Sequence, residues 1–190
     1  MKRFKSFLLK ESLFLIVLFG VSFSFGDDSN NKEGNTALHV ASQFNDVDVI
    51  KALLESGADP TAKNKYKDTP LHLAIKYENS DVVEALLANG ADINAKNNMG
   101  RTPLHNAASE NSYLHFSIRR YISVEFVKFL LANGADVNAR DKEGNTALSF
   151  AIKYKNKNLE DFLKAKGAKG DNKNKKGMLL IIKNKCREIF

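Results

Sequence analysis

A six-residue phrase recurs along this chain at a fixed interval of 33 residues. Its first three copies begin at Thr36, Thr69 and Thr102 and read TALHVA, TPLHLA and TPLHNA. A fixed period of this length is typical of proteins that stack small structural units, because each unit carries an apolar face that only its neighbours can cover. The repeat therefore argues against a fold built around one undivided core.

A second phrase follows each copy of the first in the same register. It reads LLESGAD, LLANGAD and LLANGAD, and it begins at Leu53, Leu86 and Leu130. A fourth copy of the first phrase begins at Thr146, which is 44 residues after Thr102 instead of 33, so the third unit carries 11 additional residues. Alignment with the second unit places these residues at about 112–122.

The pattern within each unit predicts a pair of helices. A threonine precedes each first helix, where its hydroxyl can accept a backbone N–H; these residues are Thr36, Thr69, Thr102 and Thr146. Apolar residues then recur at helical spacing, first at Leu71, Ala74 and Ile75 and, after a polar break, at Val82, Val83 and Leu86. A glycine stands just past each second helix, where a left-handed C-cap favours it; these are Gly57, Gly90, Gly134 and Gly167.

These phrases resemble the ankyrin-repeat family, whose units have the same period and a T-P-L-H-x-A phrase. The resemblance implies an all-α solenoid of helix pairs linked by β-hairpin-like fingers. It also implies that His39, His72 and His105 orient the neighbouring finger through hydrogen bonds, with Ser149 in their place in the fourth unit. On this register a linker over 27–30 precedes repeats at 31–63, 64–96, 97–140 and 141–169, and a tail over 170–190 follows.

The first 26 residues differ in character from the repeats. A basic start is followed by an uncharged apolar run over 12–25 and by small residues before Asp27. This order predicts a signal peptide over 1–26, and therefore a periplasmic or secreted protein of bacterial type. An uncleaved membrane anchor is the alternative, although the run is shorter than the roughly 20 residues that span a bilayer.

The net charge of +7 is unevenly distributed along the chain. Residues 1–26 carry +3 and residues 164–190 carry +7, so the body over 27–163 carries −3. A nucleic-acid-binding protein concentrates lysine and arginine on its folded body, so we expect no nucleic-acid partner. The basic segment over 164–176 is interpreted as a solvated end, and its alternative role is contact with anionic lipid or an acidic partner. The last stretch, 178–190, is expected to form a short helix, and the alternatives are that it covers the final repeat or stays loose.

No pattern in the sequence points to catalysis or to a cofactor. A Gly-rich phosphate loop, a G-x-S-x-G elbow, H-E-x-x-H and C-x-x-C are all absent. The histidines of the repeated phrase are expected to lie about 10 Å apart, too far to share one metal ion. Cys186 is the single cysteine, so no internal disulfide can form. We expect a monomeric protein that is not an enzyme and holds no metal or cofactor.

Recognition of another protein is the remaining role. The family resemblance implies that partners contact the finger tips and the exposed, concave face of the first helices. The tip residues of this chain are Lys32, Glu33, Lys65, Tyr66, Asn98, Met99, Lys142 and Glu143. An equivalent position on the first helices holds Phe44, Tyr77, Glu110 and Tyr154, which either form a row for binding or pack against the next repeat.

The inserted segment is the other candidate for binding. Eleven residues are close to three helical turns, so they could lengthen a helix and keep its apolar face in phase. Leu114, Ile118 and Ile122 recur at helical spacing, and Tyr113 and Tyr121 are candidate contact residues. We expect an amphipathic helical extension that either binds a partner or packs on the protein itself.

The sequence as a whole favours an exported, non-catalytic protein–protein interaction module with an unidentified protein partner. The alternative is an envelope-associated structural or membrane-surface protein. Such a protein would be held by the N-terminal apolar segment or by the basic tail.

Overall fold

The computed structural model describes residues 32–44, 46–75, 78–109 and 122–170. In these ranges every regular element is a helix, as the resemblance to ankyrin repeats predicts, and no helix in them is long and apolar enough to cross a membrane. They belong to two compact units, unit 1 within Met1–Asn98 and unit 2 within Met99–Phe190. The predicted signal peptide and the predicted tail helix lie outside the described residues.

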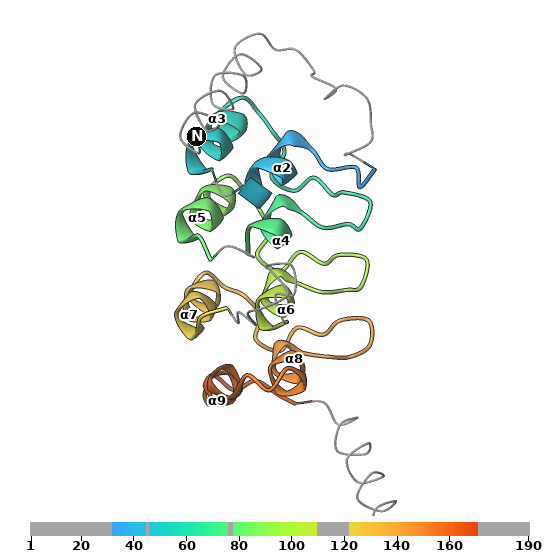
Figure 1. The fold of residues 1–190 in the computed structure, drawn as a ribbon, viewed down its shortest axis with the longest axis vertical. Coiled ribbons are helices and arrows are strands. Elements are labelled where there is room, and N and C mark those ends of the chain that lie inside the picture. The colour runs from blue at the N-terminus through green and yellow to red at the C-terminus, as the bar shows by residue number, and fades with distance from the viewer. Residues whose placement is uncertain (1–31, 45, 76–77, 110–121, 171–190) are drawn as a thin grey trace, which may run out of the picture. The chain divides into compact units, whose positions relative to one another are not determined.

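Unit 1 contains two helix pairs, α2 (Ala37–Phe44) with α3 (Val47–Glu55) and α4 (Pro70–Ala74) with α5 (Ser80–Ala88). The first helices α2 and α4 pack against each other, the second helices α3 and α5 do the same, and each pair is also in contact internally. Within this unit the first helices lie between the second helices and the projecting loops (Figure 1). Its core residues with no exposed surface are Ile50, Leu71, Ala74, Ile75, Val82, Val83 and Leu86.

Unit 2 contains the pairs α6 (Pro103–Ala108) with α7 (Val124–Ala132) and α8 (Ala147–Lys153) with α9 (Lys157–Ala165). It repeats the arrangement of unit 1, because α6 packs against α8 and α7 packs against α9. Its core residues with no exposed surface are Val127, Leu130, Ala151, Leu159 and Leu163. Full burial of one such leucine or valine side chain contributes about 2 kcal/mol, and packing of the two helix pairs against each other completes that burial.

The helix ends follow from side-chain chemistry. Thr69 and Thr102 have extended backbones ahead of a proline whose fixed φ suits the first helical position. Each second helix begins after a residue whose side chain accepts a backbone N–H of the first turn; these residues are Asp46, Asn79, Ser123 and Asn156. The glycines that follow the second helices have left-handed φ angles of 87°, 94°, 89° and 80° at Gly57, Gly90, Gly134 and Gly167.

The two junctions of the insertion correct one expectation from the sequence. Helix α6 ends at Ala108, and Ser109 has an extended backbone with φ −80° and ψ 153°, so α6 does not continue into the insertion. Helix α7 begins at Val124, after the extended Ser123. The expected lengthening of either neighbouring helix is therefore wrong, because both junctions leave the helical conformation. Residues 110–121 themselves lie outside the described part of the chain.

The C-terminal end of the insertion is a buried apolar residue. Ile122 is 4% exposed and immediately precedes the N-cap Ser123, and Val127 in the first turns of α7 is fully buried. An apolar residue at this position typically packs against the fourth helical residue and fixes the angle at which the chain enters the helix. In the second and fourth repeats the same position holds Glu78 and Lys155, both with left-handed φ angles. The insertion therefore replaces a polar left-handed turn with a buried apolar residue.

Candidate partner-binding surface

The loops that precede the first helices form fingers whose tips are joined by backbone hydrogen bonds. In unit 1 the N–H of Lys65 donates to the carbonyl of Glu33 at 2.8 Å, and the N–H of Asn98 donates to the carbonyl of Tyr66 at 2.8 Å. In unit 2 the N–H of Lys142 donates to the carbonyl of Met99 at 2.9 Å. These bonds connect residues that the sequence places at the finger tips. The tip side chains therefore start from tethered backbones.

Asparagine side chains provide a second link between the fingers of unit 1. Nδ2 of Asn64 donates to Oδ1 of Asn35 at 2.8 Å, and Nδ2 of Asn97 donates to Oδ1 of Asp68 at 2.8 Å. Oδ1 of Asn64 also accepts the backbone N–H groups of Tyr66 and Asp68, which fixes the turn at the tip. This role of the asparagines was not predicted from the sequence. The signal was available, because Asn64, Asn97 and Asp141 stand at the same register of successive repeats.

In unit 2 the equivalent position holds Asp141, which forms a charged pair with Arg101. The Arg101 guanidinium lies 3.7 Å from the Asp141 carboxylate and 4.6 Å from the centre of the Phe150 ring. Burial raises the pKa of Asp141, but hydrogen bonds from the side chain and backbone of Asn145 and from the Glu143 backbone outweigh it and lower that pKa. Arg101 was not predicted, because nothing in the repeated phrase indicates that its side chain stacks on an aromatic ring.

The histidine of the repeated phrase connects the start of its own helix to the following finger at His39 and at His105. In unit 1 the backbone N–H of Thr36 donates to Nδ1 of His39 at 3.2 Å, so Nδ1 is the unprotonated nitrogen. Nε2 therefore carries the proton and donates to the carbonyl of Asp68 at 2.9 Å. Burial lowers the pKa of His39, which favours the neutral ring that this arrangement requires.

His105 makes the same connection in unit 2. Its Nδ1 accepts the backbone N–H of Thr102 at 3.1 Å, and its Nε2 lies 3.1 Å from the carbonyl of Asn145. Burial lowers its pKa as well. His72 accepts the N–H of Thr69 through Nδ1 at 3.2 Å, and in the fourth repeat Oγ of Ser149 accepts the N–H of Thr146 at 3.1 Å. The hydrogen bond from histidine to finger that the family resemblance implied is thus present at His39 and His105.

The predicted tip residues are all exposed to solvent. This holds for Lys32, Glu33, Lys65, Tyr66 and Asn98 in unit 1 and for Met99, Lys142 and Glu143 in unit 2. The apolar members stand out, because Tyr66 is 47% exposed and Met99 is 55% exposed. Tethered backbones and exposed large side chains make each set of tips a candidate contact surface.

The predicted row of aromatic residues on the first helices is described only in part. Phe44, at the end of α2, is 76% exposed, so it does not pack against a neighbouring repeat. Tyr154 is half-buried and stacks on Phe150 of its own helix α8 with ring centres 6.4 Å apart, so this contact is made within one repeat. The remaining candidates, Tyr77, Glu110, Tyr113 and Tyr121, lie outside the described residues.

The finger of the second repeat has a strained backbone residue. Lys67 has φ 56°, a left-handed conformation, where the other repeats have Gly34, Gly100 and Gly144. We expect Lys67→Gly to raise the free energy of unfolding by about 0.5–1 kcal/mol, because relief of this strain exceeds the entropy that glycine adds to the unfolded chain. Thermal denaturation of the variant and the wild-type protein measures the gain.

The control is Gly100→Ala, which adds a Cβ at the position equivalent to Lys67. A Cβ built on Gly100, which has φ 72°, would lie 2.9 Å from the backbone nitrogen of Lys142. Gly100→Ala should therefore destabilise the protein by about 2 kcal/mol, through both strain and collision with a backbone atom. An equal loss of stability in Lys67→Gly would contradict the assignment of strain to Lys67.

In each unit, helix pairs pack against each other and their fingers are joined by hydrogen bonds. The described ranges contain no group of residues that could hold a metal ion. These features define a class of repeat protein. The profile described as "Ankyrin repeats (many copies)" matches residues 61–107 and 105–151, and that described as "Ankyrin repeat" matches 33–65. The chain belongs to the ankyrin-repeat family. Repeats of this kind are protein–protein interaction modules and are generally non-catalytic. No curated protein gives a significant match.

Proposed function

We propose that this protein is exported and that it binds a protein partner, without catalysis, through its finger tips and the exposed face of its first helices. The observation that carries the proposal is the combination of exposed tip side chains with backbones that are already bonded to the neighbouring finger. A surface ordered before binding loses less conformational entropy on association. The tips are therefore suited to recognition.

Large apolar side chains support the same proposal. Aromatic residues and methionine are enriched at the buried centres of protein interfaces. Tyr66 and Met99 at the tips and Phe44 at the end of α2 have this character. They are the side chains that we expect a partner to cover.

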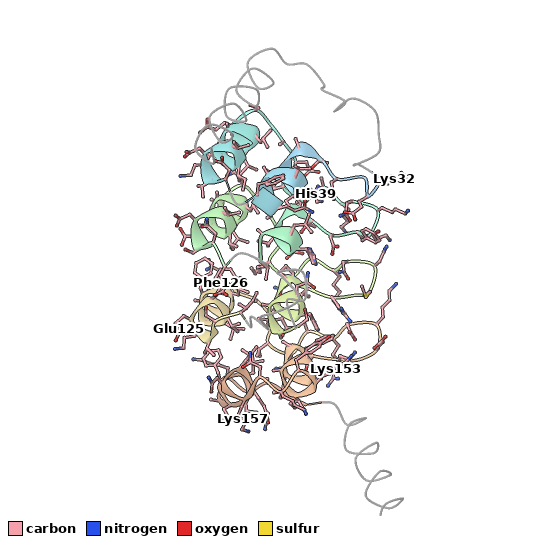
Figure 2. All side chains as sticks on the ribbon, viewed as in Figure 1. Lys32, His39, Glu125, Phe126, Lys153 and Lys157 are labelled. Carbon is pink, nitrogen blue, oxygen red and sulfur yellow. The ribbon has the colours of Figure 1, made fainter. Side chains whose placement is uncertain are left out.

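Site-specific photo-crosslinking tests the binding surface. A photoreactive amino acid replaces Tyr66 or Met99 at the tips, and Lys51 or Glu125 on the second helices as matched exposed controls. Figure 2 shows Glu125 on the second-helix side of unit 2. We expect crosslinks to a protein from the native compartment at the tip positions. Crosslinking confined to the second-helix positions would refute the proposed surface.

Export is supported by the basic start and the apolar run ahead of Asp27. We expect the mature protein to begin at Asp27 and to occur in the periplasmic or secreted fraction. N-terminal sequencing of protein purified from each cell fraction measures this. Intact Met1 in a soluble cytoplasmic pool would contradict it.

A further inference from the structure

Charge in unit 1 is separated between the fingers and the second helices. The finger segments 32–35, 63–68 and 96–98 carry five lysines and only two acidic residues. The second helices with their caps, 46–56 and 78–89, carry six acidic residues and one lysine, Lys51. The two sets lie on opposite sides of α2 and α4 within this unit (Figure 1). The mildly acidic body thus contains a basic finger surface.

The positive charge on these fingers is available to a partner. Lys32, Lys63, Lys65 and Lys67 are exposed, and within the part of the chain that the structure describes none of them has an ion-pair partner. Figure 2 shows Lys32 on the finger side of unit 1. Of the two acidic residues in these segments, Asp68 is half-buried and its carboxylate accepts a hydrogen bond from Asn97, so it is less accessible to a partner than the lysines are.

The surface also has an apolar centre. Tyr66 stands between Lys65 and Lys67 at the tip of the middle finger of the unit, and the residue is 47% exposed. Its backbone carbonyl accepts the N–H of Asn98, which holds the tip in place. An aromatic ring flanked by ammonium groups is complementary to an apolar side chain flanked by carboxylates.

The arginines in the fingers of unit 2 make contacts within their own unit. Arg101 stacks on Phe150 and faces the Asp141 carboxylate. Nη1 of Arg140 donates to the carbonyl of Gly144 within its own finger at 2.7 Å. These guanidinium groups take part in holding their own unit together. Lys142 is also exposed at a tip of unit 2, but the acidic Glu143 follows it, whereas Tyr66 in unit 1 stands between two exposed lysines.

We propose that the basic finger surface of unit 1, Lys32, Lys63, Lys65 and Lys67 around Tyr66, binds an acidic segment of a partner protein that carries an apolar side chain among its carboxylates. This inference rests on the proposed function and specifies the chemistry of the partner. A long phosphate polymer is disfavoured, since Glu33 lies at a tip and the second helices of the same unit are acidic.

Binding of a defined peptide tests the proposal. The probe is a fluorescein-labelled peptide of repeated Glu-Glu-Leu, and its affinity for the full chain is measured by fluorescence anisotropy. We expect Lys65→Glu to weaken binding about tenfold and to reduce its dependence on salt. Tyr66→Ala should also weaken it about tenfold, because it removes the apolar contact. Both positions are exposed, and circular dichroism verifies that the variants are folded.

A matched control separates local recognition from net charge. Lys51→Glu changes the charge of unit 1 by the same amount on the acidic side, and we expect at most about a twofold effect. Equal loss in Lys51→Glu and Lys65→Glu would overturn the proposal, as would absence of peptide binding to the wild-type protein. Tighter binding of single-stranded DNA or of phosphatidylglycerol vesicles than of the peptide, with the same dependence on Lys65, would overturn it in favour of a phosphate ligand.

The crosslinking experiment distinguishes failure of this inference from failure of the proposed function. If position 66 crosslinks to a protein in the native compartment while the acidic peptide does not bind, the fingers bind a partner of other chemistry. In that case only the acidic-segment inference fails. If the peptide binds with the expected variant pattern but no tip position crosslinks in the native compartment, the proposed physiological function fails instead.

Discussion

Replacement of His105 by alanine is expected to lower the free energy of unfolding by about 3 kcal/mol. The side chain is 1% exposed and connects Thr102, at the start of its own helix, to Asn145 in the following finger. Alanine would leave the N–H of Thr102 and the carbonyl of Asn145 without this partner. It would also open a cavity beside Phe150, whose ring meets the imidazole edge-on with centres 6.0 Å apart. Urea denaturation followed by circular dichroism measures the loss.

A serine variant distinguishes the contribution of the Thr102 hydrogen bond from that of the Asn145 contact. Ser149 stands at the equivalent position of the fourth repeat, where its Oγ accepts the N–H of Thr146. His105→Ser should therefore keep the cap of α6 but lose the contact with Asn145, and we expect an intermediate loss of about 2 kcal/mol. An alanine variant as stable as the wild-type protein would contradict a bracing role for the histidine.

Much of the fold could be predicted because its determinants are local and repeat in phase. Pro70 requires a first-turn position, and the apolar spacing of Leu71 and Ile75 requires one buried helix face. Both follow from backbone geometry and do not depend on distant residues. The boundaries of the insertion were less predictable. Helical phase permits an extension of α6, but the extended backbone of Ser109 ends the helix first.

The sequence predicts which positions form the candidate surface, but it predicts the chemistry of that surface only in part. The register identifies Lys65, Tyr66 and Met99 as tip residues, because every repeat places its tip at the same offset. The register does not show which polar groups become occupied by structural contacts. Asp68 and Arg101 both appear as charged residues in the sequence, yet one accepts a hydrogen bond from Asn97 and the other stacks on Phe150. The net charge of the chain also does not reveal the separation of charge within unit 1, because opposite charges cancel when they are summed along the chain.

The protein is expected to lose stability as the pH falls from 7.5 to 5. Burial lowers the pKa of both His39 and His105 from the ordinary value of 6.5, so the folded state binds protons only at a lower pH than the unfolded chain does. Stability is therefore complete above pH 6.5 and decreases as the pH falls through that value. At pH 5, each histidine that stays neutral in the folded state lowers the free energy of unfolding by at most about 2 kcal/mol, and the two together lower it by up to about 4 kcal/mol.

Burial disfavours the charged form of both rings and is the main reason for this acid sensitivity, and the fixed tautomer opposes protonation as well. A proton added to Nδ1 would face the backbone N–H of Thr36 or Thr102, and the nearby Arg101 also opposes a charged His105, while Asp68 and Asp141 offset the cost only in part. Urea denaturation at intervals across this pH range measures the slope, and His105→Ser should remove the share that belongs to His105. A wild-type stability that stays constant or rises toward pH 5 would show that the folded state accommodates the imidazolium ion.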